Sequence, residues 1–171
     1  LLAATQEGLT NLYEIVSHAG THIIHGRQKD FPVTDLKFMA QHGKGIIALT
    51  ACVAGIVPYH IINGNDKMAL HYIDELHNIF DEVYLEVQPH EFPEQLLVNS
   101  KLVSFASQTG FKLVITSDSH YINSGDNQYH NILKNMCHQK VFTTNNHLYT
   151  PEEMEAYCIK YGIPLDCIAN T

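Results

Sequence analysis

The run Val83-Tyr84-Leu85-Glu86-Val87 is a short apolar segment, and its length predicts a β-strand. Before it, residues 66–80 place apolar side chains at helical spacing. After it, residues 93–109 are predicted to form a second helix, which Gly110 ends. A strand enclosed by two helices is typical of a sheet built from β–α units.

Two other segments extend this pattern in both directions along the chain. Ile46–Leu49 is a compact apolar run between Gly45 and Thr50, which predicts a strand buried on both faces. Residues 112–116 are predicted to form a third strand, and residues 1–3 resemble the tail of another. Strands that alternate with helical crossovers predict an α/β fold with a parallel sheet or barrel.

The remaining segments are predicted to be helices and connections. Helices are expected over residues 5–19, from Thr34 to Gln41, over 54–62 with an interruption at Pro58, over 126–138, from Pro151 after a Thr150 cap, and over 165–170, whereas Thr21–Pro32 and Thr143–Asn146 are expected to be polar connections. The chain shows no internal repeat and no linker-like boundary, so a single domain over residues 1–171 is expected.

Composition excludes several classes of protein. The 171 residues are 45% hydrophobic and 16% charged, which is unlike a disordered tail or a fibrous repeat. No apolar run has the roughly 18–20 residues of a spanning helix. Four cysteines without a CxxC pair, and no secretory signal, indicate a reducing cytoplasmic environment. A net charge of −8 argues against a stand-alone duplex-DNA binder, because phosphate contacts need a basic face.

Metal-ligating residue types follow or occupy all three predicted strands. Cys52 follows the first, Glu86 lies in the second with His90 just after it, and Asp118 and His120 follow the third. The carboxyl ends of such strands meet at one rim, where these folds place their chemistry. Thiolate, imidazole and carboxylate groups are ligands for zinc or a similar metal. In extended backbone, an Asp-x-His pair would point both side chains the same way.

Each of these residues also has an ordinary structural interpretation. Cys52 suits a small core position, and Glu86 suits a buried carboxylate that is hydrogen-bonded or ion-paired. His90 can decorate a loop, and Asp118 can cap a turn. Their occurrence at three consecutive strand ends favours a site over four separate coincidences. The chain has 12 histidines, and His147 shows no functional pattern among them.

Several motifs, in a shared order along nearly the whole chain, carry a family resemblance. They are Leu1-Leu2-Ala3 with Glu7-Gly8, Gly45-Ile-Ile-Ala-Leu-Thr-Ala-Cys52, Tyr84-Leu85-Glu86-Val87-Gln88-Pro89-His90, Pro93-Glu94-Gln95, Ser117-Asp118-Ser119-His120-Tyr121, Thr150-Pro151-Glu152-Glu153-Met154 and Ala169-Asn170-Thr171. The chain thereby resembles the PHP (polymerase and histidinol phosphatase) domain of bacterial replicative DNA polymerases, the DNA polymerase III alpha subunits.

The resemblance implies a distorted (β/α)7 TIM-like barrel with divalent metal ions at its rim: zinc, or manganese or magnesium, up to three in an intact domain. Cys52, Asp118 and His120 match metal-ligand positions. His90 matches a rim histidine, and Glu86 matches a strand glutamate to which no metal contact is assigned. Members of this family with an intact cluster are phosphoesterases, some with 3′–5′ exonuclease activity, in which the ions would activate a water and neutralise phosphoryl charge.

Two alternatives to an active phosphoesterase remain. In some family members the domain is an inactive structural module that stabilises the polymerase and docks a separate proofreading exonuclease. A stand-alone phosphatase of the histidinol-phosphate type is disfavoured by the polymerase-like segment that begins at Thr150. In either polymerase reading, DNA and the other polymerase domains are the expected partners, without a membrane.

The chain departs from the family pattern in three places. The family's opening His-x-His and its other early ligands would precede Leu1, so the chain matches roughly the C-terminal two-thirds of the domain. Ser117 stands where Asn is frequent, and residues 89–91 replace a more basic, glycine-containing turn. These changes leave the three matched ligand positions intact and would alter access of substrate to the rim.

Overall fold

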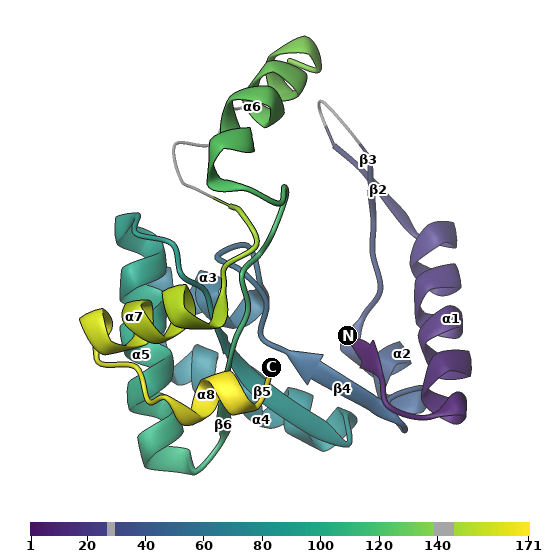
Figure 1. Ribbon diagram of the computed structural model, residues 1–171. Coiled ribbons are helices and arrows are strands. Elements are labelled where there is room, and N and C mark those ends of the chain that lie inside the picture. The colour runs from purple at the N-terminus through teal and green to yellow at the C-terminus, as the bar shows by residue number, and fades with distance from the viewer. Residues whose placement is uncertain (27–29, 139–145) are drawn as a thin grey trace. The chain divides into compact units, whose positions relative to one another are not determined.

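The computed structural model describes residues 1–26, 30–138 and 146–171, and Figure 1 shows its helices and strands. In chain order these elements are β1 (Leu2–Ala3), α1 (Gln6–Thr21), β2 (Ile23–His25), β3 (Asp30–Pro32), α2 (Leu36–Gln41), β4 (Ile46–Leu49), α3 (Ile56–Ile62), α4 (Asp66–Ile79), β5 (Glu82–Val87), α5 (Pro93–Thr109), β6 (Lys112–Ile115), the 3-10 helix η1 (Ser124–Asp126), α6 (Asn127–Met136), α7 (Pro151–Tyr161) and α8 (Asp166–Ala169). The expected mixture of helices and strands is confirmed.

The chain divides into two compact units. The first unit contains residues 1–49 and 70–84, and the second contains residues 50–69 and 85–171. The chain passes from one unit to the other at the end of β4, within α4 and within β5. Each unit is described separately below.

In the first unit, β4 pairs with a strand on each side. It runs parallel to β5, with Ala48 opposite Val83, which confirms the predicted parallel pairing across a helical crossover. It runs antiparallel to β1, with Leu2 opposite Ile47, so the sheet is not parallel throughout. The buried core of this unit consists of Ile15, Ile46, Ala48, Phe80 and Val83.

The start of α1 lies directly against the turn before β4. The Thr5 hydroxyl caps the helix by accepting the Gly8 amide hydrogen at 2.9 Å, and the Ala4 amide donates to the Gly45 carbonyl at 2.8 Å. Gly45 has a φ of +74°, and a Cβ on Gly8 would overlap the Gly45 carbonyl. Two glycines therefore allow the helix and the turn to make backbone contact.

The segment expected to be a polar connection between α1 and α2 contains an antiparallel pair of strands. Residue Ile24 of β2 lies opposite Phe31 of β3, and His25 lies opposite Asp30. The His25 and Asp30 side chains also form an exposed ion pair at 3.0 Å. The prediction of a simple connection was wrong, because it gave weight to Gly26, Asp30 and Pro32 as breakers and overlooked the apolar residues that face one another.

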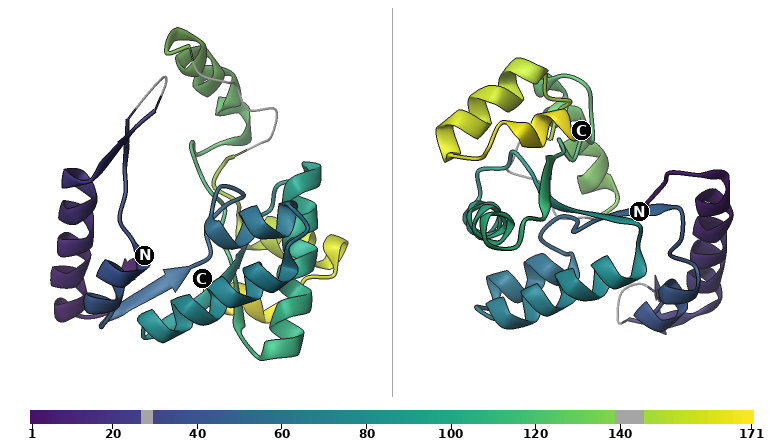
Figure 2. Two further views of the ribbon diagram at one scale, coloured as in Figure 1. Left: turned by 180° about the vertical axis from the view of Figure 1, so that it is seen from behind. Right: turned by 90° about the horizontal axis from the view of Figure 1, so that it is seen from below.

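In the second unit, β6 is the neighbour of β5 in the sheet, and the Thr116 amide, just after β6, donates to the Val87 carbonyl at 3.1 Å. Helix α5 has the predicted bounds and ends at Gly110 with a φ of +81°. It buries Val98, Leu102 and Phe105. Figure 2 shows α3 beside α5, and α8 packs against β6.

Helix α3 continues through Pro58, where an interruption was expected. The helix begins at Ile56, so Pro58 occupies its first turn, in which the backbone nitrogen needs no hydrogen-bond acceptor within the helix. Pro58 is fully buried. The proline is therefore a packing residue here, and it does not break the helix.

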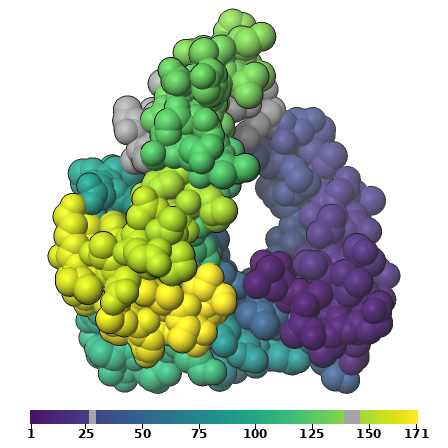
Figure 3. Space-filling view, viewed as in Figure 1, coloured from purple at the N-terminus to yellow at the C-terminus, as the bar shows by residue number. Residues whose placement is uncertain are grey.

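Helix α7 begins as the sequence predicts. The Thr150 hydroxyl accepts the Glu153 amide hydrogen at 3.2 Å, and the Glu153 carboxylate accepts the Thr150 amide hydrogen at 2.8 Å. This reciprocal capping box, with Pro151 in the first turn, fixes the helix start. In Figure 3, α7 and α8 contribute to the surface of the second unit. Within the described ranges, none of the helices has the length and apolarity needed to cross a membrane.

Candidate functional site at the strand ends

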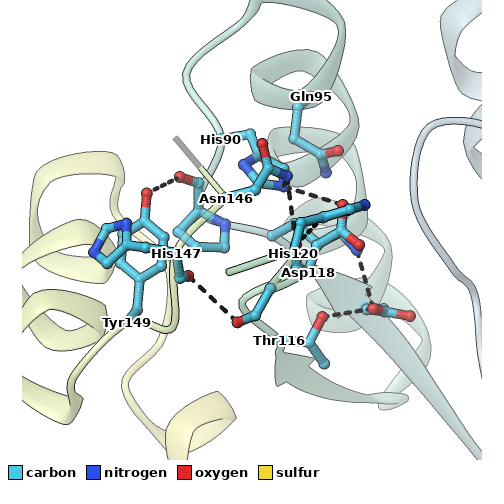
Figure 4. A network of polar contacts seen from close by, with 12 residues as sticks. His90, Gln95, Thr116, Asp118, His120, Asn146, His147 and Tyr149 are labelled. Atoms are coloured by element: carbon cyan, nitrogen blue, oxygen red, sulfur yellow. Dashed lines mark hydrogen bonds and ion pairs between the residues drawn. The ribbon is translucent and has the colours of Figure 1, made fainter. Parts of the chain in front are cut away.

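The five residues singled out from the sequence all belong to the second unit. Cys52 lies in the turn after β4, Glu86 lies on β5, and His90 follows β5. Asp118 and His120 follow β6. Figure 4 shows His90, Asp118 and His120 close together with several residues that the sequence did not single out.

The centre of the site is a pair formed by His90 and Asp118. The His90 Nε2 lies 3.4 Å from an Asp118 carboxylate oxygen. The His90 side chain is 3% exposed, whereas the Asp118 side chain is 36% exposed. The pair therefore joins a buried imidazole to a carboxylate that water and solutes can reach.

The backbone at Asp118 differs from the extended conformation expected from the sequence. Asp118 has a φ of +46°, in the left-handed region that Asp tolerates better than most residues. The ring of His120 turns back, and its Nδ1 lies 2.8 Å from the Asp118 carbonyl oxygen. Since the carbonyl only accepts, Nδ1 carries the hydrogen in this contact. His120 as a residue is exposed, and its ring lies edge-on to the His130 ring, with centroids 5.5 Å apart.

The environment keeps Asp118 ionised. The hydrogen bond from His90, together with the positive potential of His120 and His90, lowers the pKa of Asp118 although partial burial raises it. A depressed pKa and partial exposure suit a carboxylate that binds a cationic ligand at neutral pH.

Glu86, near the His90–Asp118 pair in the chain's second unit, is a buried hydrogen-bond acceptor. Its carboxylate accepts from the Thr116 hydroxyl at 2.6 Å, the Ala51 amide at 3.1 Å and the Gln88 side chain at 3.2 Å. The Thr50 hydroxyl in turn accepts the Glu86 amide hydrogen at 2.9 Å. The carboxylate thus ties the ends of β5 and β6 to the turn that carries Cys52, which matches the structural interpretation of this residue.

The described residues do not by themselves provide a complete metal centre. Across residues 1–26, 30–138 and 146–171, no three His, Cys, Asp or Glu side chains form a group that could hold a metal ion. Cys52 is half-buried and His90 approaches Asp118 as a pair. The three matched positions Cys52, Asp118 and His120 are therefore not assembled into a site in this structure.

A later segment, which sequence reasoning missed, completes the surroundings of the pair. The Asn146 side-chain nitrogen lies 3.4 Å from the His90 Nε2 and 3.4 Å from the Asp118 carbonyl oxygen. The Asn146 carbonyl accepts the His120 amide hydrogen at 2.8 Å. Asn146 was expected to end a polar loop, and no local sequence pattern indicates contacts with residues 26 to 56 positions away.

His147 and Tyr149 extend this segment away from the pair. The two rings stack with centroids 4.2 Å apart, and His147 Nε2 lies 3.3 Å from the Glu153 carboxylate. The Thr150 amide and His147 both lower the pKa of Glu153 through hydrogen bonds to its carboxylate. Glu153, the third residue of α7 and a member of its capping box, therefore also orients His147, which Figure 4 shows beside Tyr149.

The backbone around His90 is held by buried hydroxyl and amide groups. The Tyr157 hydroxyl donates to the His90 carbonyl at 3.1 Å, and the Tyr149 hydroxyl donates to the Pro89 carbonyl at 3.1 Å. Burial raises the pKa of Tyr157, so this phenol stays protonated and remains a donor. Asn99 donates to the Gln88 carbonyl at 2.7 Å. The turn that presents His90 is therefore anchored at three successive residues.

Comparison with known proteins identifies the family. The PHP domain family matches residues 1–90. The chain is 33% identical over 134 residues to the DNA polymerase III subunit alpha of Aquifex aeolicus, which covers 78% of the chain and 11% of that protein. It is 30% identical over 168 residues to the same subunit of Thermus aquaticus, which covers 91% of the chain and 13% of that protein.

The chain thus spans only 11% and 13% of the lengths of these two relatives. The family match ends at His90, whereas the similarity to the Thermus aquaticus subunit covers nearly the whole chain. Together with the mixed α/β fold and its parallel β4–β5 pair, these similarities show that the chain belongs to the PHP domain family and is related to DNA polymerase III alpha subunits.

Proposed function

We propose that this chain forms part of a phosphoesterase site of the 3′–5′ exonuclease type within a bacterial replicative DNA polymerase. The observation that carries the proposal is the His90–Asp118 pair at the carboxyl ends of β5 and β6. A buried imidazole beside an ionised, partly exposed carboxylate is an arrangement found at sites of acid–base and metal chemistry. The family and the named relatives point to DNA as the substrate.

In this proposal the chain's own residues hold and orient the reactive groups of the site, and they do not supply the DNA-binding surface. Asp118 provides the negative charge at the rim, His90 fixes its carboxylate, and His120 presents an exposed imidazole edge. The net charge of −8 leaves phosphate binding to other parts of the polymerase. The remaining polymerase domains, and a proofreading exonuclease subunit, are the proposed partners.

The proposal includes divalent metal ions, zinc or manganese or magnesium. Cys52, Asp118 and His120 would each contribute to their binding, with further ligands from outside the described residues. We assign no reaction step to these ions, because the described residues do not assemble three ligands. The proposal also treats the sheet as part of a distorted (β/α)7 barrel and places the parent polymerase in the cytoplasm, where the chromosome lies.

The test uses the full-length protein that contains this chain, purified without any other exonuclease. Asp118→Asn removes the carboxylate charge and keeps the shape of the side chain. We expect it to abolish release of 3′-terminal nucleotides from DNA while polymerisation continues. Asp74→Asn, on the exposed face of α4, is the matched control and is expected to leave both activities unchanged. Full nuclease activity of the Asp118→Asn protein would refute the proposal.

A second function is a structural module that stabilises the polymerase and docks a separate exonuclease. The observation that favours it is the lack, among the described residues, of a three-ligand metal group. If the domain is a structural module, the triple variant with Cys52→Ser, Asp118→Asn and His120→Ala will polymerise and proofread as the unmodified protein does. Loss of nuclease activity in that triple variant would favour the phosphoesterase instead.

A further inference from the structure

We propose that Asn146 is the positioning residue of this site, and that it sets the separation and orientation of His90 and Asp118. This inference rests on the phosphoesterase function proposed above. It assigns a role to a residue in a segment that the sequence marks only as a polar loop.

Asn146 contacts His90, Asp118 and His120. Its side-chain nitrogen lies between His90 Nε2 and the Asp118 carbonyl oxygen, 3.4 Å from each, and its carbonyl holds the His120 amide at 2.8 Å. Figure 4 shows the amide beside the imidazole and the carboxylate.

The same residue is itself held firmly in place. Asn146 is 3% exposed, and its amide donates to the Tyr121 hydroxyl at 2.7 Å. That donor is the backbone N–H of Asn146, and the next residues continue the backbone contact: His147 forms a parallel bridge with Tyr121, and the Leu148 amide donates to the Tyr121 carbonyl at 3.0 Å. A buried side chain with an anchored backbone loses little further freedom when it restrains its neighbours.

The contacts explain how one amide can restrain the pair. The Asp118 carbonyl only accepts, so the Asn146 amide must present its NH2 group there, which fixes the orientation of the amide. His90 Nε2 donates to the Asp118 carboxylate, so it does not also accept from the Asn146 NH2 group 3.4 Å away; the amide limits the position of the ring by contact. Asn146, together with the His120 ring, also holds the carbonyl of Asp118, whose backbone is left-handed.

Two variants of the full-length protein separate the donor role from the shape of the side chain. Asn146→Ala removes the amide, and Asn146→Asp keeps the shape but removes the N–H donors. Both retain the backbone contacts with Tyr121 and His120, so we expect both to fold, with melting temperatures below that of the unmodified protein because a buried hydrogen bond is lost. Asn63→Ala is the control, because Asn63 is exposed and its side chain donates to the Tyr59 carbonyl within the end of its own helix.

We expect kcat for release of 3′-terminal nucleotides to fall about 10- to 100-fold in both Asn146 variants, as is typical when a supporting contact of a site is lost. KM is expected to stay within about twofold, because positioning acts on the reacting groups more than on DNA binding. A crystal structure of Asn146→Ala is expected to show a His90–Asp118 separation longer than 3.4 Å. Asn63→Ala is expected to match the unmodified protein.

Failure of this inference differs from failure of the proposed function. If Asp118→Asn is inactive and either Asn146 variant keeps full kcat, the positioning role is wrong and the phosphoesterase function stands. An Asn146→Ala protein with an unchanged His90–Asp118 geometry would also overturn the positioning role. If Asp118→Asn keeps full activity, both the function and the inference fall together.

Discussion

Glu86 shows how a residue of a metal-ligating type can have a structural role. Its carboxylate is buried and accepts three hydrogen bonds, from Thr116, Gln88 and the Ala51 amide. No cation pairs with this carboxylate among the described residues, so these neutral donors offset the free-energy cost of burying it. The residue type alone allowed a metal role, and only the surrounding donors distinguish the two possibilities.

We predict that Glu86→Gln lowers the free energy of unfolding by about 1–3 kcal/mol. The new NH2 group cannot accept a hydrogen bond, so at least one of the donors that now bond to the carboxylate loses its acceptor. The measurement is denaturant unfolding followed by a probe in the second unit. Glu155→Gln, an exposed change on α7, is the control and is expected to shift stability by less than about 0.5 kcal/mol. Equal stability of the two variants would contradict the structural role of Glu86.

Two cysteines near the C-terminal end illustrate burial acting on a titratable group. The Cys158 and Cys167 sulfurs lie 3.8 Å apart, and both residues are fully buried. Burial, with the neighbouring Cys158, raises the pKa of Cys167 to about 12, and burial also raises the pKa of Cys158. The protonated thiols therefore stabilise the fold below pH 9, and this contribution is lost as the pH rises from about 9 towards 12.

At pH 8 we expect iodoacetamide to modify the exposed Cys137 and to spare Cys158 and Cys167, because only the thiolate reacts and burial blocks access. Peptide mass spectrometry of the native protein measures the three sites separately. The unfolded protein provides the control, in which all three are expected to react. Labelling of Cys158 as fast as Cys137 in the native protein would show that the pair is not buried.

At the scale of elements, most boundaries followed from local patterns. Helix α5 has the predicted bounds, and Thr150 and Pro151 place the start of α7 correctly, because caps and breakers act within a few residues. The antiparallel β2–β3 pair was missed because its pairing depends on residues of two separate segments that face one another. Pro58 was misread because its effect depends on where the helix begins.

The contact between α1 and the turn before β4 depends on Gly8. A methyl group at this position would overlap the Gly45 carbonyl, which is backbone and cannot move aside alone. We predict that Gly8→Ala lowers the free energy of unfolding of the first unit by several kcal/mol, on the order of other overpacked sites or more. Hydrogen exchange of α1 and β4 amides in the full-length protein measures this change.

Gly20→Ala provides a matched control on the same helix. No atom lies within 4 Å of a Cβ built at Gly20, and the residue is inside α1. Alanine is therefore expected to stabilise the helix by about 1 kcal/mol or less. Similar exchange rates for Gly8→Ala and the unmodified protein would mean that the helix and the turn do not meet as described.

At the scale of the whole molecule, the sequence indicated the fold class and which strand ends carry polar residues. Those conclusions use periodicity and the order of elements, which are local properties. The contacts of Asn146 with His90 and Asp118 could not be predicted in this way, because they join residues 56 and 28 positions apart. Likewise the left-handed backbone at Asp118, which redirects His120, has no counterpart in the spacing of the motif.

Metal binding also depends on how much of the whole molecule is present. The described residues offer pairs of ligands and not a group of three, so a divalent ion would be bound weakly by residues 1–171 alone. We predict that these 171 residues, expressed alone and dialysed, retain well under one divalent ion per chain, whereas the full-length polymerase retains ions that Asp118→Asn reduces. Elemental analysis of both proteins measures this difference.

Tight retention by the 171 residues alone, lost in Cys52→Ser, would mean that Cys52 and Asp118 converge when metal is present. Retention by neither protein would instead favour the structural module over the phosphoesterase.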